Sequence, residues 1–136
     1  MPFSFHLKTS IMRVYIIKII AVLFVLAGIN HFLTPEFYLP LIPDYLPFPD
    51  LLNYISGGLE IVLGVLIWTP QYRRLGGLGL AGLMILFIPA HIHFIYLGHC
   101  IPDGLCVDPW IGWVRLLVIQ PALIFLGFRI AREGKN

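Results

Sequence analysis

Hydrophobic residues in this chain form four long segments, and most of the charged residues lie between or beside them. The segments cover approximately residues 14–32, 51–68, 75–97 and 110–128. Each is close to the roughly 20 residues that a helix needs to cross about 30 Å of hydrocarbon. None alternates with the period of two expected of a membrane-spanning strand. The pattern predicts an all-α, polytopic membrane protein whose four transmembrane helices form a bundle.

The overall composition supports this prediction. Of the 136 residues, 59% are hydrophobic and 12% are charged, and the mean hydropathy is +0.89. A water-soluble domain of this length has too little interior to bury so much apolar surface. We therefore expect a single transmembrane domain over residues 1–136, surrounded by membrane lipids. The composition excludes a disordered chain, a secreted disulfide scaffold and a nucleic-acid-binding domain.

The positive charges indicate how the segments are oriented. Eight of the nine Lys and Arg residues lie on one side of the predicted spans, whereas the two loops on the other side contain five acidic residues and no Lys or Arg. Because cytoplasmic loops are enriched in Lys and Arg, we expect both termini and the turn at Arg73–Arg74 to be cytoplasmic. The eight residues are Lys8, Arg13, Lys18, Arg73, Arg74, Arg129, Arg132 and Lys135.

The first outward loop, residues 33–50, contains five prolines among largely apolar side chains. Prolines at this density prevent a regular helix and stiffen the chain. A simple linker would be more polar. We therefore expect this loop to lie on the bilayer surface or to cap the helices.

Polar side chains within the spans concentrate in the outer halves. Ionisable groups are costly in hydrocarbon, so they face the interior of a bundle and are candidate functional residues. The candidates for a ligand-binding site or a buried polar cluster are Asn30, His31, Asn53, Ser56, Glu60, His91, His93 and Arg115.

Glu60 is the carboxylate closest to the predicted midplane. With a rise of 1.5 Å per residue, it lies about 13 Å below Leu51, and Arg115 lies about 7 Å below Trp110. Arg115 is the expected partner of Glu60 in a structural ion pair. The alternative is that Glu60 acts with nearby histidines as a polar contact or proton carrier for a ligand.

Two further spacings bear on this cluster. His91 and His93 project about 160° apart on a helix, so both line one cavity only if Pro89 distorts the turn. Gln120 lies about 140° around its helix from Arg115, which places it in a different contact. No spacing typical of a metal site links the histidines, and we expect no metal.

The only two cysteines, Cys100 and Cys106, lie in the second outward loop. An outward loop is an oxidising environment in a bacterium or a secretory compartment. We expect a structural disulfide there. A redox-active pair is the alternative, although the spacing is not C-x-x-C.

Several short motifs occur in a characteristic order, and together they resemble the DoxX-like family of small four-helix membrane proteins. The resemblance covers roughly residues 27–94, and its most recognisable stretch is S-G-x-x-E-x-x-x-G. One departure is His91, where the family often has Asn after Pro-Ala. The motifs are Gly28-Ile29-Asn30-His31-Phe32, Ile42-Pro43-Asp44-Tyr45-Leu46-Pro47, Ser56-Gly57-Gly58-Leu59-Glu60-Ile61-Val62-Leu63-Gly64, Pro70 with Arg73-Arg74, and Pro89-Ala90-His91-Ile92-His93.

The resemblance implies a non-catalytic subunit or scaffold of a membrane complex, since some members are linked to quinone-dependent sulfur oxidation and others to redox complexes. We therefore favour a protein that is not an enzyme, in the bacterial cytoplasmic (inner) membrane, with a membrane protein or a second copy as partner. The alternative is a site for a quinone or another lipid, formed by Glu60, His31 and one of His91 and His93. The sequence indicates no other cofactor.

Overall fold

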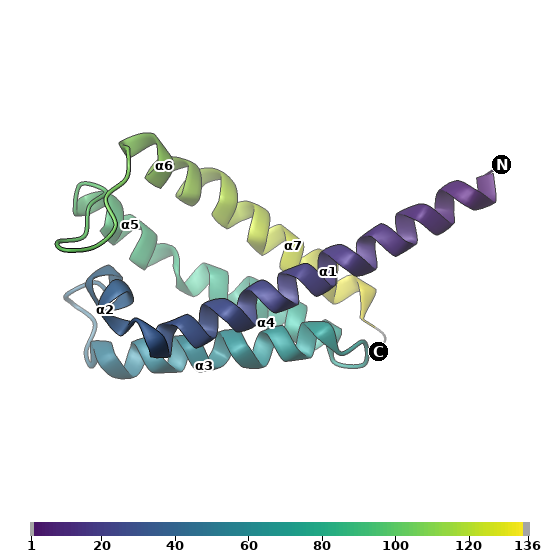
Figure 1. The fold of residues 1–136 in the computed structure, drawn as a ribbon, viewed down its shortest axis with the longest axis horizontal. Helices are drawn as coiled ribbons and strands as arrows, with labels where there is room; N and C mark the ends of the chain where they lie inside the picture. The colour runs from purple at the N-terminus through teal and green to yellow at the C-terminus, as the bar shows by residue number, and fades with distance from the viewer. Residues whose placement is uncertain (1, 135–136) are drawn as a thin grey trace.

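The structure is a computed structural model that describes residues 2–134, with side chains from residue 11 onward (Figure 1). Of the basic residues used above for orientation, the side chain of Lys8 and the whole of Lys135 lie outside the described part. The described chain is all-helical. Its only β-type pairing is an isolated bridge between Cys100 and Cys106.

Four stretches are long and apolar enough to cross a membrane, and each matches one predicted span. They are Ile11–Leu33, Pro49–Trp68, Arg73–Tyr96 and Pro109–Glu133. The helices are α1 (Pro2–Leu33), α2 (Pro35–Tyr38), the 3-10 helix η1 (Leu39–Leu41), α3 (Pro49–Trp68), α4 (Arg73–Leu86), α5 (Ile88–Tyr96), α6 (Pro109–Val114), the π-helix η2 (Arg115–Ile119) and α7 (Gln120–Glu133).

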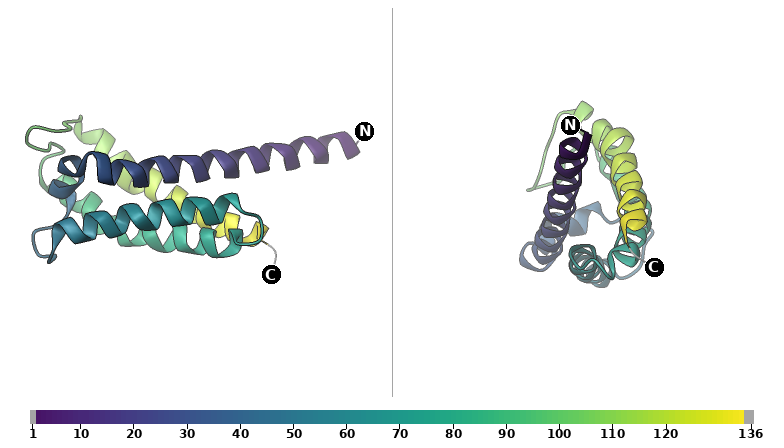
Figure 2. Two further views of the ribbon diagram at one scale, coloured as in Figure 1. Left: turned by 60° about the horizontal axis from the view of Figure 1, so that its bottom comes forward. Right: turned by 90° about the vertical axis from the view of Figure 1, so that its right-hand side faces the viewer.

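The helices form two hairpins that lie side by side. α1 packs along α3, α4 packs along α7, and α3 joins the hairpins by packing on α4 (Figure 2). α1 and α7 approach each other at the end that holds the C-terminus, where Arg13 lies 3.9 Å from Glu133. From there the α6–η2–α7 segment diverges from α1 toward the opposite end, which we call the loop end (Figure 1).

Buried apolar side chains from all four long segments meet nearer the C-terminal end. This core leaves the loop end to the polar residues described below. Its members are Ile17, Ala21, Phe24, Leu63, Ile67, Leu80, Leu83, Met84 and Ile130.

Glycines set the close contacts inside each hairpin. A Cβ atom at Gly57 of α3 would lie 2.6 Å from the Cβ of His31 and 2.8 Å from the carbonyl oxygen of Gly28, both on α1. In the second hairpin, a Cβ at Gly77 of α4 would lie 2.5 Å from the carbonyl oxygen of Gly127 on α7. Small residues therefore allow the backbones to approach, as in helix pairs packed within membranes.

The buried side chain of Arg73 forms hydrogen bonds that stabilise the turn between α3 and α4. The Arg73 Nε donates to the carbonyl oxygen of Ile67 at 3.1 Å, and its Nη2 lies 3.5 Å from the carbonyl oxygen of Trp68. The last carbonyls of a helix have no partner within the helix. A guanidinium at this position satisfies them and also carries the charge that a helix C-terminus favours.

Two prolines interrupt the second hairpin. Pro89 has no N–H to continue the helix, and the segment divides at Phe87 into α4 and α5. Pro121 follows η2, whose widened turn is closed by the Gln120 N–H donating to the carbonyl oxygen of Arg115. Such single π-turns relieve a local mismatch in the hydrogen-bond ladder and change the direction of nearby side chains.

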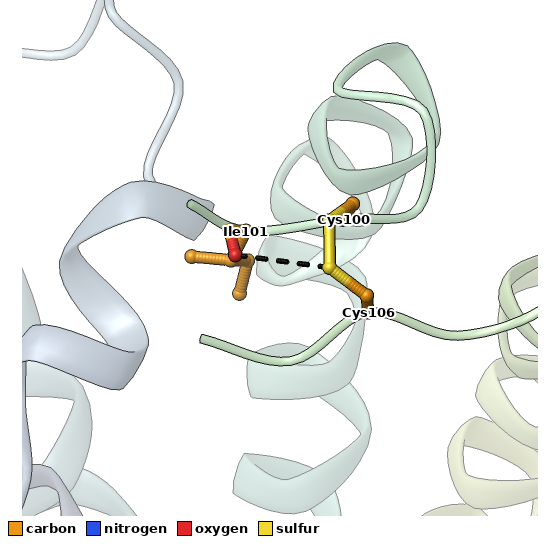
Figure 3. Close-up of a disulfide and its surroundings, with 3 residues drawn as sticks. All are labelled: Cys100, Ile101 and Cys106. Carbon is orange, nitrogen blue, oxygen red and sulfur yellow. Dashed lines mark hydrogen bonds between the residues drawn. A yellow bond between two sulfur atoms is a disulfide. The ribbon is translucent and has the colours of Figure 1, made fainter. Parts of the chain in front are cut away.

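The loop end carries the two predicted outward loops. In the first, the prolines limit helix to the single turn of α2 and to η1, and Tyr38 folds back against α1. In the second, Cys100 and Cys106 form the predicted disulfide, with 4.0 Å between their Cα atoms (Figure 3). The buried Ile101 beside it packs inward, and its carbonyl oxygen lies 4.0 Å from the Cys106 Sγ.

Candidate functional site

A buried histidine–asparagine pair joins α1 to α3 at the loop end. The Nδ1 of His31 lies 2.7 Å from the Oδ1 of Asn53, and the Asn53 Nδ2 donates to the carbonyl oxygen of His31 at 2.9 Å. A carbonyl oxygen only accepts, so it fixes the amide orientation of Asn53. The Asn53 Oδ1 therefore faces His31, and the Nδ1 of His31 must carry the proton that is donated to it.

The assignment of the proton to Nδ1 determines whether the Nε2 of His31 can donate a hydrogen bond to Glu60. Its Nε2 lies 3.6 Å from the Oε2 of Glu60, and both side chains are buried, with 8% and 7% of their surfaces exposed. With Nδ1 protonated, a neutral His31 would direct the lone pair of Nε2 toward a carboxylate. Two facing acceptors repel each other in a low-dielectric interior. The pair must therefore hold one more proton, either on Nε2 or on the Glu60 carboxyl group.

Glu60 is incompletely satisfied in this arrangement. Its Oε2 is buried and has no hydrogen-bond partner within the described residues. The 3.6 Å separation from His31 exceeds the 2.7–3.2 Å typical of an N–H···O bond. Buried polar atoms in folded proteins are nearly always paired. An unpaired carboxyl oxygen beside a histidine is therefore a position with unused hydrogen-bonding capacity.

Tyr38 covers the other face of His31. The two rings stack with their centroids 3.6 Å apart and an angle of 20° between their planes. Asn30, one residue before His31, donates from Nδ2 to the Tyr38 hydroxyl at 2.9 Å. Tyr38 is half-buried, so it forms the side of the cluster reachable from outside. Sequence reasoning did not include it among the site residues, although its place in a stiff, apolar loop after α1 was the available signal.

The second hairpin contributes a matching group. His91 on α5 lies close to the side chain of Gln120. The Gln120 Nε2 donates to the carbonyl oxygen of Met84 on α4. In both hairpins, a histidine thus lies beside a carboxamide of the returning helix. That carboxamide in turn donates to a backbone carbonyl of the first helix. Gln120 was expected in a different contact from Arg115, and its hydrogen bond to the Met84 carbonyl oxygen is such a contact.

Arg115 occupies a different position from the one expected. The basic group within ion-pair distance of Glu60, among the described residues, is His31 and not Arg115. The glycine contacts between α1 and α3 explain this, because they bring the His31 backbone directly against the helix that carries Glu60. Arg115 starts η2 in the other hairpin. It lies close enough to Glu60 and His91 for their charges to interact, while its side chain stays exposed.

Three other polar residues lie apart from these bonds. Ser56 is half-buried on α3 and makes no side-chain hydrogen bond within the described chain. His93 stacks on Tyr96 with 6.3 Å between ring centroids. His99, one of the histidines for which no metal site was expected, is buried against Gly112. Within residues 11–134, no three His, Cys, Asp or Glu side chains converge as metal ligands would.

The fold and the cluster define a small all-helical protein with four membrane-length helices and a buried polar centre at one end. The chain belongs to a family described as a domain of unknown function, DUF8561, whose sequence profile matches residues 20–131. That range includes every residue of the polar cluster and both cysteines. Searches of curated proteins and of solved structures found no match.

Proposed function

We propose that the protein is an integral protein of the bacterial cytoplasmic membrane, with both termini in the cytoplasm and the loop end outside. Four helices of membrane length support insertion, as do the many large hydrophobic side chains exposed along them. Apolar surface this extensive requires a partner, and lipid is the partner that suits helices of this length. The distribution of Lys and Arg supports the orientation.

We further propose that the polar cluster binds a small apolar molecule with an oxygen-bearing head, of the quinone and quinol class. The observation that carries this proposal is the unpaired Oε2 of Glu60, which lies 3.6 Å from the Nε2 of His31. If the proton is on Glu60, the carboxyl group donates to a quinone carbonyl. If it is on His31, the carboxylate accepts from a quinol hydroxyl. The same pair therefore serves both forms of the head group.

Arg115 and Tyr38 complement this pair from the exposed side. A guanidinium donates and never accepts, so Arg115 suits a second carbonyl oxygen of the same molecule. The half-buried ring of Tyr38, already stacked on His31, offers an aromatic surface to a flat ring. A ligand that meets a few polar groups inside an otherwise apolar site is typical of small-molecule recognition in proteins.

A second candidate follows from the same bonds. The hydrogen bonds of His31 with Asn53 tie α1 to α3, so the cluster also suits a non-catalytic scaffold in a membrane complex, as the DoxX-like resemblance implies. In that case Glu60 stabilises the fold and binds nothing. The two candidates differ in what the loss of the Glu60 charge does.

The test compares Glu60→Gln with Glu36→Gln, the same change at an exposed residue of the first loop. Full-length protein in neutral detergent is titrated with a short-chain ubiquinone and with its quinol, and thermal unfolding is measured in parallel. We expect Glu60→Gln to weaken binding about tenfold or more, the value of a hydrogen bond to a charged group. Its unfolding should change little, and Glu36→Gln should behave as wild type.

Two results would contradict the ligand proposal. One is wild-type protein that binds neither form of the probe. The other is Glu60→Gln protein that binds as wild type does. A loss of stability of about 3–5 kcal/mol, as for a broken buried ion pair, together with recovery in the Glu60→Gln, His31→Gln double variant, would establish the scaffold role instead.

A further inference from the structure

A hydrophobic groove follows the contact between α1 and α3. It has a volume of about 230 Å³ and lies away from the polar cluster, toward the turn that joins α3 to α4. Its lining side chains are hydrophobic, and four of them are exposed, so the groove is open to the surroundings of the protein. The lining residues are Ala21, Val22, Val25 and Leu26 of α1, and Gly64, Val65 and Trp68 of α3.

The groove exists because two small residues meet at its floor. A Cβ atom at Gly64 would lie 2.7 Å from the carbonyl oxygen of Ala21 and 2.7 Å from the Cγ2 of Val25. The α3 backbone is therefore in direct contact with α1 at this point. The larger side chains beside this contact, among them Val22 and Val65, are exposed and form the walls. A narrow, hydrophobic depression of this kind fits an extended hydrocarbon chain.

A cation lies at one end of this groove. Lys18 lies four residues before Val22 and seven before Val25, so all three lie on one face of α1. The Lys18 Nζ lies 4.9 Å from the centre of the Trp68 ring. Trp68 is the last residue of α3 and lines the groove. The ammonium group therefore lies at the end of the groove nearest the α3–α4 turn, on the side proposed above as cytoplasmic.

The charge at this end indicates which molecule the groove fits. An ammonium group above an aromatic ring stays charged, and it has three N–H donors and no acceptor. An anionic group is its complement, and the hydrophobic groove begins directly beyond it. A helix from a second copy of the chain is a poorer match, because Glu133 is the only acidic residue on that side of the predicted spans and it pairs with Arg13.

We propose that the groove holds an acyl chain of an anionic phospholipid whose phosphate binds Lys18. Lysines at the cytoplasmic surface of a membrane attract anionic lipids, and a tryptophan at this depth is typical of the boundary between head groups and hydrocarbon. The inference requires membrane insertion but is independent of the ligand at Glu60, because the groove and the polar cluster share no residue.

The experiment measures lipid binding to full-length protein in neutral detergent by native mass spectrometry. The probes are dioleoyl phosphatidylglycerol, dioleoyl phosphatidylcholine with the same acyl chains, and glycerol 3-phosphate, which has an anionic head and no chain. Lys18→Gln removes the charge, and its control Arg129→Gln removes one positive charge from an exposed residue of α7. Val65→Trp fills the groove, and its control Val62→Trp places the same ring on an exposed residue of α3 outside the groove.

We expect phosphatidylglycerol to bind wild-type protein more tightly than phosphatidylcholine does. Lys18→Gln should bind phosphatidylglycerol about tenfold more weakly or worse, as when a charge-assisted hydrogen bond is lost. Val65→Trp should also lose binding, because the new ring takes the place of the acyl chain. Lys18→Arg, which keeps the charge, should retain binding, as should both controls.

Four results would overturn the proposal. Equal losses in Lys18→Gln and Arg129→Gln would show that net charge alone attracts the lipid. Equal losses in Val65→Trp and Val62→Trp would show that the groove is not the site. Equal binding of the two lipids, or displacement of phosphatidylglycerol by glycerol 3-phosphate at equal concentration, would contradict recognition of head and chain together. A dimer that is lost only in Val65→Trp would assign the groove to a second copy. Thermal unfolding of each variant identifies any loss caused by misfolding.

Discussion

The contact between α1 and α3 at Gly57 allows a prediction with an internal control. A methyl group at Gly57 would lie 2.6 Å from the His31 Cβ and 2.8 Å from the Gly28 carbonyl oxygen. Carbon atoms pack at about 3.5–4.0 Å, and neither atom belongs to a flexible side-chain end. Gly57→Ala must therefore move the two helices apart by about 1 Å. That movement also lengthens the two hydrogen bonds between His31 and Asn53.

The expected cost is the sum of three terms. Overpacking costs about 1–3 kcal/mol, and the two weakened hydrogen bonds cost about 1 kcal/mol each. The helix preference of alanine over glycine returns about 1 kcal/mol. The net loss in the free energy of unfolding is therefore about 2–4 kcal/mol for Gly57→Ala.

The neighbouring Gly58 provides the control. A Cβ there meets nothing within 4 Å, so Gly58→Ala keeps the helix-propensity gain without the collision. We expect it to be as stable as wild type or more stable by up to about 1 kcal/mol. Reversible unfolding in mixed detergent micelles, followed by circular dichroism, measures both variants. Equal stability of Gly57→Ala and Gly58→Ala would refute the close approach of the two helices.

Three further predictions concern the turn, the loop cysteines and the orientation. Arg73→Gln removes donors to the last carbonyls of α3 and should lower the free energy of unfolding by about 1–3 kcal/mol, whereas an unchanged midpoint in thermal unfolding would remove its role in that turn. Cys100 and Cys106 should react with a maleimide only after reduction, and two thiols labelled without reductant would contradict the disulfide. Reporter fusions should place Asn136 in the cytoplasm and Pro102 outside, and an exterior C-terminus would reverse the proposed orientation.

The spans were predictable because length and hydropathy alone define them. Four apolar segments of about 20 residues leave few alternatives for a chain of this size. The candidate polar residues were also predictable, since any buried ionisable group in such a segment is conspicuous. His31, Asn53 and Glu60 were all identified in this way, and the structure brings them together.

Their pairing was not predictable from depth alone. Arg115 was the expected partner of Glu60 because it is the only Lys or Arg in the outer half of a predicted span. The helix that packs against α3, however, is decided by small-residue contacts, and Gly28 opposite Gly57 selects α1. The π-turn before Pro121 was not predictable either, because helical-wheel angles assume a regular helix.

Each hairpin places a histidine next to a carboxamide side chain, but the charged residue beside that pair differs between the two hairpins. His31 is hydrogen-bonded to Asn53 in the first hairpin, and His91 lies close to the side chain of Gln120 in the second. The first arrangement is extended by Glu60 and the second is accompanied by Arg115. Two similar frameworks thus present an acceptor from one side and a permanent donor from the other. If the cluster only fastened helices, a direct Glu–Arg pair would satisfy both charges. Their separation, with Glu60 Oε2 unpaired, is what a molecule carrying oxygens at both ends of a ring would complete.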